Sequence, residues 1–280
     1  MTEGVLIKMI QNDPELKNID CIIFDEFHER SLNADLGLTF CLEIRSELRK
    51  DLGILIMSAT LDAAPVAKLM GNAPVITSLG KSYDVHPYYL SKPWNFNINQ
   101  KNNFIQAISD LIIRALQENE GSILAFLPGA GEIKQLQAFL KPKLPNDLDI
   151  RPLYGAMSFD EQQKAILPSQ RRKLILATSI AETSLTIKDI RIVIDGGLTR
   201  RSRFDPSSGM SRLVTEKVTK AEAIQRMGRA GRTNTGVCYK LWTKGEEGGL
   251  TPFPEPEILI SDLSPLAMEL AAWGVNNPEN

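Results

Sequence analysis

Hydrophobic and polar positions follow two patterns along the chain, and together these patterns predict an α/β fold. Short apolar runs are typical of strands that are buried on both faces of a sheet. Six such runs occur, at Cys21–Phe24, Gly53–Met57, Ser122–Leu127, Lys173–Ala177, Ile190–Ile194 and Val237–Trp242. Longer stretches between them repeat apolar residues with helical spacing, most clearly Phe104–Leu116 and Ile133–Leu140. This alternation of strands and helices favours an open, mostly parallel sheet.

Two interruptions of the pattern divide the chain into three expected parts. Gly80, Pro87, Pro93 and an asparagine-rich stretch break the alternation between residues 80 and 103, and residues 251–256 contain three prolines. Residues 1–79 and 80–250 are therefore expected to form separate α/β domains. Residues 251–280 are expected to begin a third part with a new helix.

Length and composition are typical of a soluble globular protein. A chain of 280 residues is long enough for two domains. Its three cysteines, Cys21, Cys41 and Cys238, form no CxxC pair, which favours a reducing compartment. The sequence also lacks an apolar run of about 20 residues and the N-terminal pattern of a signal peptide. We therefore expect a cytoplasmic protein without a membrane partner.

The net charge of −2 conceals an uneven distribution. Residues 188–244 contain thirteen Lys or Arg and five Asp or Glu, a local balance of +8, and the rest of the chain is acidic. A basic segment in an acidic protein suggests an anionic partner such as phosphate or nucleic acid. A solvated charged face is the alternative, and the sequence alone leaves it open.

Polar side chains follow two of the predicted strands. The motif DEFH, residues 25–28, comes directly after the first strand, and SAT, residues 58–60, follows the second. In open α/β sheets, ligands bind beyond the carboxyl ends of the strands. An acid at such a place can hold Mg²⁺ on the phosphates of a nucleotide, and its neighbour can orient the attacking water. For either motif alone an ordinary solvated turn is the simpler interpretation, so the combination is what matters.

The motif QRMGRAGR at residues 225–232 suggests a phosphate-binding face. At about 100° per residue of α-helix, Gln225, Arg229 and Arg232 would share one narrow face, with Arg226 pointing elsewhere. Two guanidinium groups on one face could stabilise a phosphate that develops negative charge. A surface helix with salt bridges is the alternative, although Gly228 and Gly231 are poor choices for a merely stable helix.

Together these motifs resemble those of the DEAH-box branch of the superfamily 2 helicases. DEFH and SAT resemble motifs II and III, ATSIAETSLTI at residues 177–187 resembles motif V, and QRMGRAGR resembles motif VI. The resemblance spans nearly the whole chain, and Phe27 together with Trp273 and Gly274 favours the bacterial HrpB-type branch. It implies two RecA-like parallel-sheet domains, of which the first is incomplete, followed by the start of a winged-helix domain. It also implies ATP-dependent RNA helicase activity, with ATP and Mg²⁺ as cofactors and single-stranded nucleic acid, most plausibly RNA, as partner.

The resemblance also implies a role for each matching residue. Asp25 and Glu26 would hold Mg²⁺, and Glu26 would polarise the attacking water. The residues expected to contact the nucleotide from the second domain are Gln225, Arg229, Arg232, Ser184 and Thr186. Those expected to couple the nucleotide site to the nucleic acid are His28, Ser58 and Thr60. Those expected to contact the RNA backbone are Thr2, Gly129, Thr178 and Thr183. Ser179 replaces the family's usual asparagine and is assigned no role.

The 280 residues contain no phosphate-binding loop of the form GxxxxGK[ST]. Gly80, Lys81 and Ser82 supply the last three residues of that motif, but Val75 stands where its first glycine is required. The resemblance places the loop upstream of residue 1, so Met1 is expected to be an internal methionine or the start of a truncated gene. The chain alone is therefore expected to hydrolyse ATP negligibly, residues 1–79 to be unstable with uncovered apolar faces, and residues 80–250 to fold by themselves. A non-enzymatic RNA-binding adaptor and a DNA translocase are the alternatives.

Overall fold

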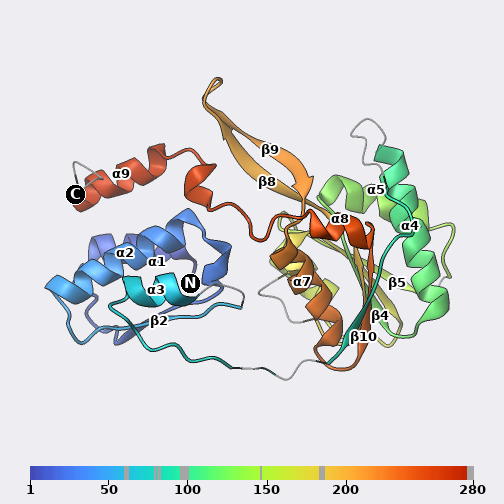
Figure 1. Cartoon of the computed structure of the whole chain (residues 1–280), viewed down its shortest axis with the longest axis horizontal. Helices are drawn as coiled ribbons and strands as arrows, with labels where there is room; N and C mark the ends of the chain where they lie inside the picture. The colour runs from blue at the N-terminus through green and yellow to red at the C-terminus, as the bar shows by residue number, and fades with distance from the viewer. Residues whose placement is uncertain are drawn as a thin grey trace. The chain divides into compact units, whose positions relative to one another are not determined.

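The computed structural model describes residues 1–59, 63–78, 80, 83–94, 101–145, 147–182 and 187–275, without the side chains of residues 101 and 102. The chain divides into two compact units (Figure 1). Unit 1 comprises Met1–Ser78, Ser202–Arg212 and Pro254–Asn280. Unit 2 comprises Leu79–Arg201 and Leu213–Phe253. No helix of the described residues is long and apolar enough to cross a membrane.

Unit 1 is built on a parallel pair of strands that helices cover on one face. Its elements are α1 (Glu3–Asn12), β1 (Cys21–Phe24), the 3₁₀ helix η1 (Phe27–Glu29), α2 (Leu32–Glu47), β2 (Gly53–Ile56), α3 (Ala63–Leu69), the 3₁₀ helix η4 (Glu257–Leu259) and α9 (Ser264–Trp273). Ile22 and Phe24 of β1 are buried against apolar side chains of α1 and α2. Ser31 starts α2 by accepting a hydrogen bond from the amide of Ala34, the usual cap of a helix N-terminus.

The other face of this strand pair is open in the described residues. Ile23 of β1 is 56% exposed and Leu55 of β2 is 47% exposed, whereas their neighbours in β1 are buried. Strands of a parallel sheet normally have apolar residues on both faces because both faces are covered. Burial of the strand Cys21–Phe24 was expected, and it is found on one face only. The exposed face agrees with the uncovered apolar face that the sequence predicted.

The C-terminal segment of unit 1 packs against α2. Leu266, Leu270 and Trp273 of α9 lie against the apolar cluster that contains α1 and α2. The ring of Trp273 stacks on Phe40 with 4.5 Å between ring centroids. The new helix predicted within residues 251–280 is confirmed as α9, and residues 254–275 belong with the first part of the chain in unit 1. The identity of residues 251–280 as the start of a winged-helix domain stays a prediction.

Unit 2 is built on a six-stranded parallel sheet with strand order β3-β10-β7-β4-β6-β5. The strands are β3 (Val85–Tyr88), β4 (Ser122–Phe126), β5 (Asp149–Leu153), β6 (Lys173–Ala177), β7 (Ile190–Asp195) and β10 (Gly236–Lys240). The helices are α4 (Lys101–Glu118), α5 (Ala130–Leu140), α6 (Phe159–Ile166), α7 (Lys220–Gly228) and α8 (Lys244–Gly248), with 3₁₀ helices η2 (Ser179–Ala181) and η3 (Arg229–Gly231). The predicted α/β class with a mostly parallel sheet is confirmed.

The strands of this sheet send alternate side chains into two apolar cores. In β4, Ile123 and Ala125 face the core made with α4 and α5, whereas Leu124 and Phe126 face the core on the opposite side. All four side chains are fully buried. Burial on both faces explains why the central strands read as continuous apolar runs in the sequence.

Two further strands, β8 (Leu198–Asp205) and β9 (Met210–Lys217), form a separate hairpin. Among the described residues they pair only with each other. The turn between them is stabilised by Asp205, whose carboxylate accepts hydrogen bonds from the amide and the hydroxyl of Ser207. Gly209 closes the turn with a positive φ of 66°. Figure 1 shows the two strands side by side.

All six predicted strands are present, with ends that differ by one or two residues. Two strands of the six-stranded sheet, β3 and β5, are not among the six predicted runs, and they are the two edges of that sheet; the separate pair β8 and β9 is not among them either. Edge strands are only half covered, so they carry no continuous apolar run. Each also contains a proline, Pro87 or Pro152, which is tolerated at an edge because one side of the strand has no neighbour to bond.

Candidate functional site

The two polar motifs of unit 1 leave the sheet at the same edge. Phe24 of β1 pairs with Ile56 of β2 in parallel register, so the residues after both strands emerge together. The amide of Phe27 donates to the carbonyl of Met57 at 3.1 Å, and the amide of Met57 donates to the carbonyl of Phe24 at 2.8 Å. Main-chain hydrogen bonds therefore join DEFH and the end of β1 to Met57, the residue directly before SAT, so the two motifs leave the sheet side by side.

His28 connects the two motifs through its side chain. Its Nδ1 accepts a hydrogen bond from the amide of Ala59 at 3.4 Å, so the ring proton of the neutral imidazole lies on Nε2. Nε2 lies 3.6 Å from a carboxylate oxygen of Glu26. Glu26 itself adopts a left-handed conformation, with φ 52°, in which its amide donates to the Asp25 carboxylate at 2.9 Å. A non-glycine residue at positive φ is uncommon and occurs preferentially at functional turns.

The oxygen atoms of Asp25 and Glu26 suit a Mg²⁺ ion that phosphate oxygens and water complete. Mg²⁺ prefers hard oxygen ligands and is usually bound by one or two carboxylates together with substrate phosphates. The Asp25 residue is exposed and Glu26 is partly exposed, so both can be reached from solvent. No group of three or more His, Cys, Asp or Glu side chains within the described ranges forms a self-sufficient metal site. The residues fit an ion that arrives with its nucleotide.

In unit 2, two of the predicted RNA-contacting residues follow adjacent strands. Thr178 comes directly after β6, and Gly129 lies beyond the end of β4 as the N-cap of α5. Phe126 and Ala177, the last residues of these strands, are paired. Gly129 is buried and lies directly against the guanidinium of Arg200. A Cβ at residue 129 would be only 2.1 Å from Nη1 of Arg200, so no larger residue fits without a shift of that side chain. Arg200 is held there by an ion pair with Glu132 at 2.8 Å.

The α-helix expected to carry Gln225, Arg229 and Arg232 on one face is shorter than predicted. The α-helix α7 ends at Gly228, and Arg229–Gly231 form a 3₁₀ turn. Residues of a 3₁₀ helix advance by about 120° instead of about 100°, which by itself leaves the three positions within about 60° of one another around the axis, so their burial is what distinguishes them. Gln225 is half-buried, Arg229 is buried and Arg232 is exposed. Arg229 donates a hydrogen bond to the main-chain carbonyl of Glu182.

Arg226, which was expected to point elsewhere than the face of Gln225, Arg229 and Arg232, points into the core, where it and Asp195 are fully buried. Its side chain is fully buried and bonds two carboxylates, through Nε to Glu182 at 2.6 Å and through Nη1 to Asp195 at 2.9 Å. Burial alone lowers the pKa of the guanidinium, and the charges of Glu182 and Asp195 outweigh that effect and raise it. Burial raises the pKa of Glu182 to about 7, although Arg226 opposes the shift. The sequence contains one signal for this cluster. Asp195 is the last residue of a buried strand, much as Asp25 directly follows one.

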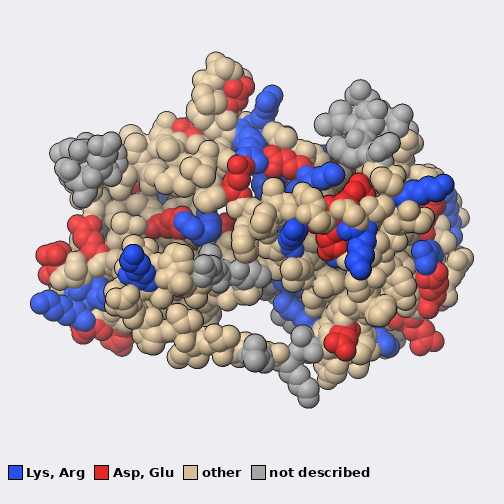
Figure 2. All heavy atoms as spheres, in the orientation of Figure 1, with Lys and Arg blue, Asp and Glu red and all other residues tan. Residues whose placement is uncertain are grey.

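The basic segment at residues 188–244 is less positive in the fold than in the sequence. The ion pairs that neutralise its basic residues include Arg200–Glu132, Arg201–Glu216, Arg201–Glu222, Arg203–Glu255, Arg226–Asp195 and Lys240–Glu247. Three of these acids lie outside the segment, so a local count of charges overestimates its field. Figure 2 accordingly shows basic and acidic side chains interspersed on the visible face.

The remaining predicted residues fall into two groups. Thr2 is exposed at the N-cap of α1, and Ser58 is exposed after β2. Thr60, Thr183, Ser184 and Thr186 lie outside the described residues. The structure thus brings Asp25, Glu26, His28 and Ser58 to one edge in unit 1. In unit 2 it brings Arg229 to Glu182, directly before residues 183–186.

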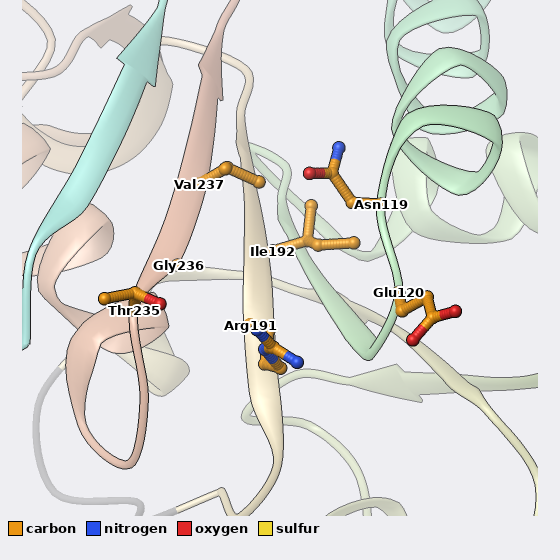
Figure 3. Close-up of a pocket in the computed structure, with 7 residues that line it drawn as sticks. All are labelled: Asn119, Glu120, Arg191, Ile192, Thr235, Gly236 and Val237. Atoms are coloured by element: carbon orange, nitrogen blue, oxygen red, sulfur yellow. The ribbon is translucent and has the colours of Figure 1, made fainter.

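A hollow in unit 2 lies away from all of these residues. It has a volume of about 360 Å³ and is lined by residues that include Glu120, Arg191 and Thr235 (Figure 3). These residues stand at the amino ends of β4, β7 and β10. Ligands of parallel α/β sheets bind at the carboxyl ends, so this hollow is at the opposite edge from Thr178 and Gly129.

Comparison with known proteins agrees with the motifs. Residues 103–234 match the family described as the helicase conserved C-terminal domain. Over 280 residues, 99% of this chain and 34% of the relative, the chain is 46% identical to ATP-dependent RNA helicase HrpB of Escherichia coli strain K12. It is 36% identical to an ATP-dependent RNA helicase HrpA homolog of Haemophilus influenzae, over 100% of this chain and 21% of that relative.

The solved structures lead to the same group. The crystal structure of the Escherichia coli DEAH/RHA helicase HrpB matches with a TM-score of 0.90 and 46% identity, over 99% of this chain and 35% of that one. The predicted resemblance to HrpB-type DEAH-box helicases is confirmed, as is the RecA-like fold of the parallel-sheet unit. The chain spans about a third of the length of its HrpB relatives.

Proposed function

Because residues 103–234 belong to the helicase conserved C-terminal domain family and the whole chain is similar to HrpB, we propose that the chain is the ATP- and RNA-handling segment of an ATP-dependent RNA helicase. The contact between Ala59 and His28 supports this most directly. It joins the acids that would serve ATP hydrolysis to the motif that would report on the nucleic acid. Coupling between these two activities is what separates a helicase from a simple ATPase.

In this proposal, unit 1 handles the hydrolytic water. Asp25 and Glu26 hold Mg²⁺, which when bound neutralises charge on the β- and γ-phosphates. Glu26 orients a water molecule for attack on the γ-phosphorus; the bond to the leaving oxygen breaks, and ADP and phosphate are released. The left-handed backbone at Glu26 fixes the direction of its carboxylate relative to Asp25.

Unit 2 supplies the opposite charge and the contacts to the strand. Arg229 and Arg232, with Gln225, stabilise the negative charge that develops on the γ-phosphate. Ser184 and Thr186 approach nucleotide or metal, and Gly129, Thr178 and Thr183 contact the phosphates of single-stranded RNA, as does Thr2 of unit 1. Such binding is expected to weaken with salt and to depend little on sequence. We place the protein in the cytoplasm.

The chain alone is not expected to be an efficient ATPase. Its 280 residues include no GxxxxGK[ST] loop, whose main-chain amides and lysine make the main contacts to the β- and γ-phosphates. The test therefore uses a chimera in which this chain replaces the matched segment of the Escherichia coli HrpB relative.

RNA-stimulated ATP hydrolysis by the chimera is the expected result, and Glu26→Gln is expected to lower its kcat by about 100-fold or more. Glu29→Gln makes the same chemical change three residues later and is expected to leave kcat within about twofold. A chimera that binds RNA without hydrolysing ATP would support an adaptor instead. Equal stimulation by RNA and DNA strands of one sequence would support a general translocase.

A further inference from the structure

The buried cluster around Arg226 joins three segments of unit 2 that are far apart in the sequence. Glu182 follows η2, Asp195 ends β7, and Arg226 lies in the last turn of α7. The guanidinium of Arg226 also donates to the carbonyl of Leu198 at 3.2 Å, and it lies 5.0 Å from the ring centroid of Phe126. One side chain therefore holds the ends of two central strands and the helix that precedes η3.

Two arginines hold Glu182 from two sides. Arg226 bonds its carboxylate, and Arg229 donates to its main-chain carbonyl. Arg226 and Arg229 are three residues apart across the junction of α7 and η3, so one short stretch of chain bonds Glu182 twice. Glu182 is also the last described residue before the threonine and serine residues assigned to RNA and nucleotide.

Burying these charged side chains costs free energy, so a purely stabilising role explains the cluster poorly. Arg226 and Asp195 are fully buried, and Oδ2 of Asp195 is buried without a hydrogen-bond partner among the described residues. Buried ion pairs are often no more stable than apolar side chains of the same volume. What such a pair does provide is a single allowed arrangement of the segments it joins.

We propose that Arg226, with Glu182 and Asp195, is a positioning cluster that sets the guanidinium of Arg229 for its action on a phosphate. The proposal rests on the proposed function for the role of Arg229. It assigns Arg226 no contact with ATP; Arg226 acts through Glu182, which Arg229 also bonds. A lysine at residue 226 keeps the charge but has one ammonium group, so it cannot reproduce the two-sided contacts of the planar guanidinium.

The first test needs no ATPase activity. In this chain, with ¹⁵N-labelled arginine, the guanidinium signal of Arg229 is expected to exchange slowly with water and to become fast in Arg226→Lys. Arg201→Lys is the matched control, because Arg201 also pairs with two carboxylates, Glu216 and Glu222, without bonding Glu182. Slow exchange of Arg229 in Arg226→Lys, or equal loss in both variants, would overturn the proposal.

The second test uses the chimera with HrpB and asks whether the two arginines act as one unit. Arg226→Lys is expected to lower kcat by about 100-fold, the loss typical of a misplaced group, with little change in KM for ATP. In the Arg229→Ala background the same change is expected to have no further effect. Additive losses would overturn the proposal, whereas full activity of Arg229→Ala alone would instead refute the proposed role of that residue.

Protein stability is separated from positioning by a third variant. Arg226→Met with Glu182→Gln and Asp195→Asn removes the buried charges together, so no carboxylate is left unpaired. This triple variant is expected to unfold at a temperature within a few degrees of the parent chain and still to show fast exchange at Arg229. Recovery of slow exchange together with stability would contradict a positioning role.

Discussion

Gly228 and Gly231 stand three residues apart in one motif, yet their surroundings differ. A Cβ at Gly231 would lie 2.5 Å from the main-chain oxygen of Tyr83 and 2.8 Å from Cγ2 of Val85. A Cβ at Gly228 would meet no atom within 4 Å in the described structure. The amide of Tyr83 donates to the carbonyl of Gly231 at 2.9 Å, so the two backbones touch. Only Gly231 is required by packing.

We predict opposite effects of alanine at these two glycines. Gly231→Ala is expected to lower the free energy of unfolding of unit 2 by about 1–3 kcal/mol, the usual cost of overpacking against backbone. Gly228→Ala is expected to leave it unchanged or to raise it by up to about 1 kcal/mol, because alanine favours helix. Urea unfolding followed by the fluorescence of the buried Trp242 measures both. Equal effects of the two substitutions would contradict the packing argument.

Glu182 makes the stability of unit 2 depend on pH near neutrality. Its pKa is about 7 in the fold and 4.5 in an ordinary environment, so the folded chain binds the proton more tightly than the unfolded chain. Stability therefore falls as pH rises from about 4.5 to about 7 and is level above that range. Among the described residues, the charged groups that act on the Glu182 carboxylate include Arg226, Glu222 and Asp195, and Arg229 bonds its main-chain carbonyl.

We predict that Glu182→Gln reduces this pH dependence, because it removes the contribution of Glu182. Urea midpoints measured from pH 5 to pH 8 are expected to decline for the parent chain and to decline less for the variant. Glu161→Gln is the control, because its capping hydrogen bonds lower the pKa of Glu161 and place its effect below this range. A decline of equal slope in the parent chain and Glu182→Gln would rule out Glu182 as its source.

Among the elements, α9 has a contact surface that can be tested by itself. Leu266, Leu270 and Trp273 recur with helical spacing and face the cluster of α1 and α2. The indole Nε1 of Trp273 also donates to Glu43 of α2 at 2.8 Å. Met268, on the other side of the helix, is 73% exposed. The helix therefore has one docking face and one solvent face.

We predict that Trp273→Ala lowers the free energy of unfolding of unit 1 by about 2 kcal/mol. This expected loss of about 2 kcal/mol is smaller than the roughly 3–5 kcal/mol typical of removing a fully buried aromatic side chain, because Trp273 is only half-buried. Met268→Ala is the control and is expected to change it by less than about 0.5 kcal/mol. Thermal unfolding followed by circular dichroism compares the variants, and equal midpoints would show that α9 does not dock through this face.

The sequence predicted the central elements and the strand-end acids, and it failed where distant segments meet. Central strands are readable because burial on both faces leaves an apolar run, whereas the edge strands β3 and β5 carry none. Asp25 and Glu26 could be predicted because ligands bind at the carboxyl ends of parallel strands. The cluster of Arg226, Glu182 and Asp195 could not, because helical spacing was extended past Gly228 and no local pattern pairs residues 182, 195 and 226.

At the scale of the whole molecule, unit 1 is discontinuous and unit 2 is inserted into it. Residues 254–275 complete unit 1, and they follow the last residue of unit 2 in the chain. The carboxylate of Glu257 accepts a hydrogen bond from the amide of Leu32, and the amide of Glu257 donates to the carbonyl of Arg30. Unit 1 therefore needs both its first segment, residues 1–78, and the segment from residue 254.

We predict that a chain ending at Phe253 keeps the unfolding transition of unit 2 and loses much of that of unit 1. The transition of unit 2 is expected to remain because the six-stranded sheet is unchanged. The transition of unit 1 is expected to weaken because α9, which packs on α2, is removed. Calorimetry of the full chain and the shortened chain provides the comparison. A matching loss in both transitions would show that the units do not unfold separately.

Because unit 2 lies between the segments of unit 1, these segments leave the ribosome at different times during synthesis. At about 5–20 residues per second, roughly 10–40 seconds pass between the emergence of α2 and that of the helix that covers it. During that interval Phe40 lacks its stacking partner Trp273, and the six-stranded sheet of unit 2 becomes complete only when β10 has emerged, shortly before α9. A nascent chain that pauses in this interval is the form most exposed to chaperones and proteases.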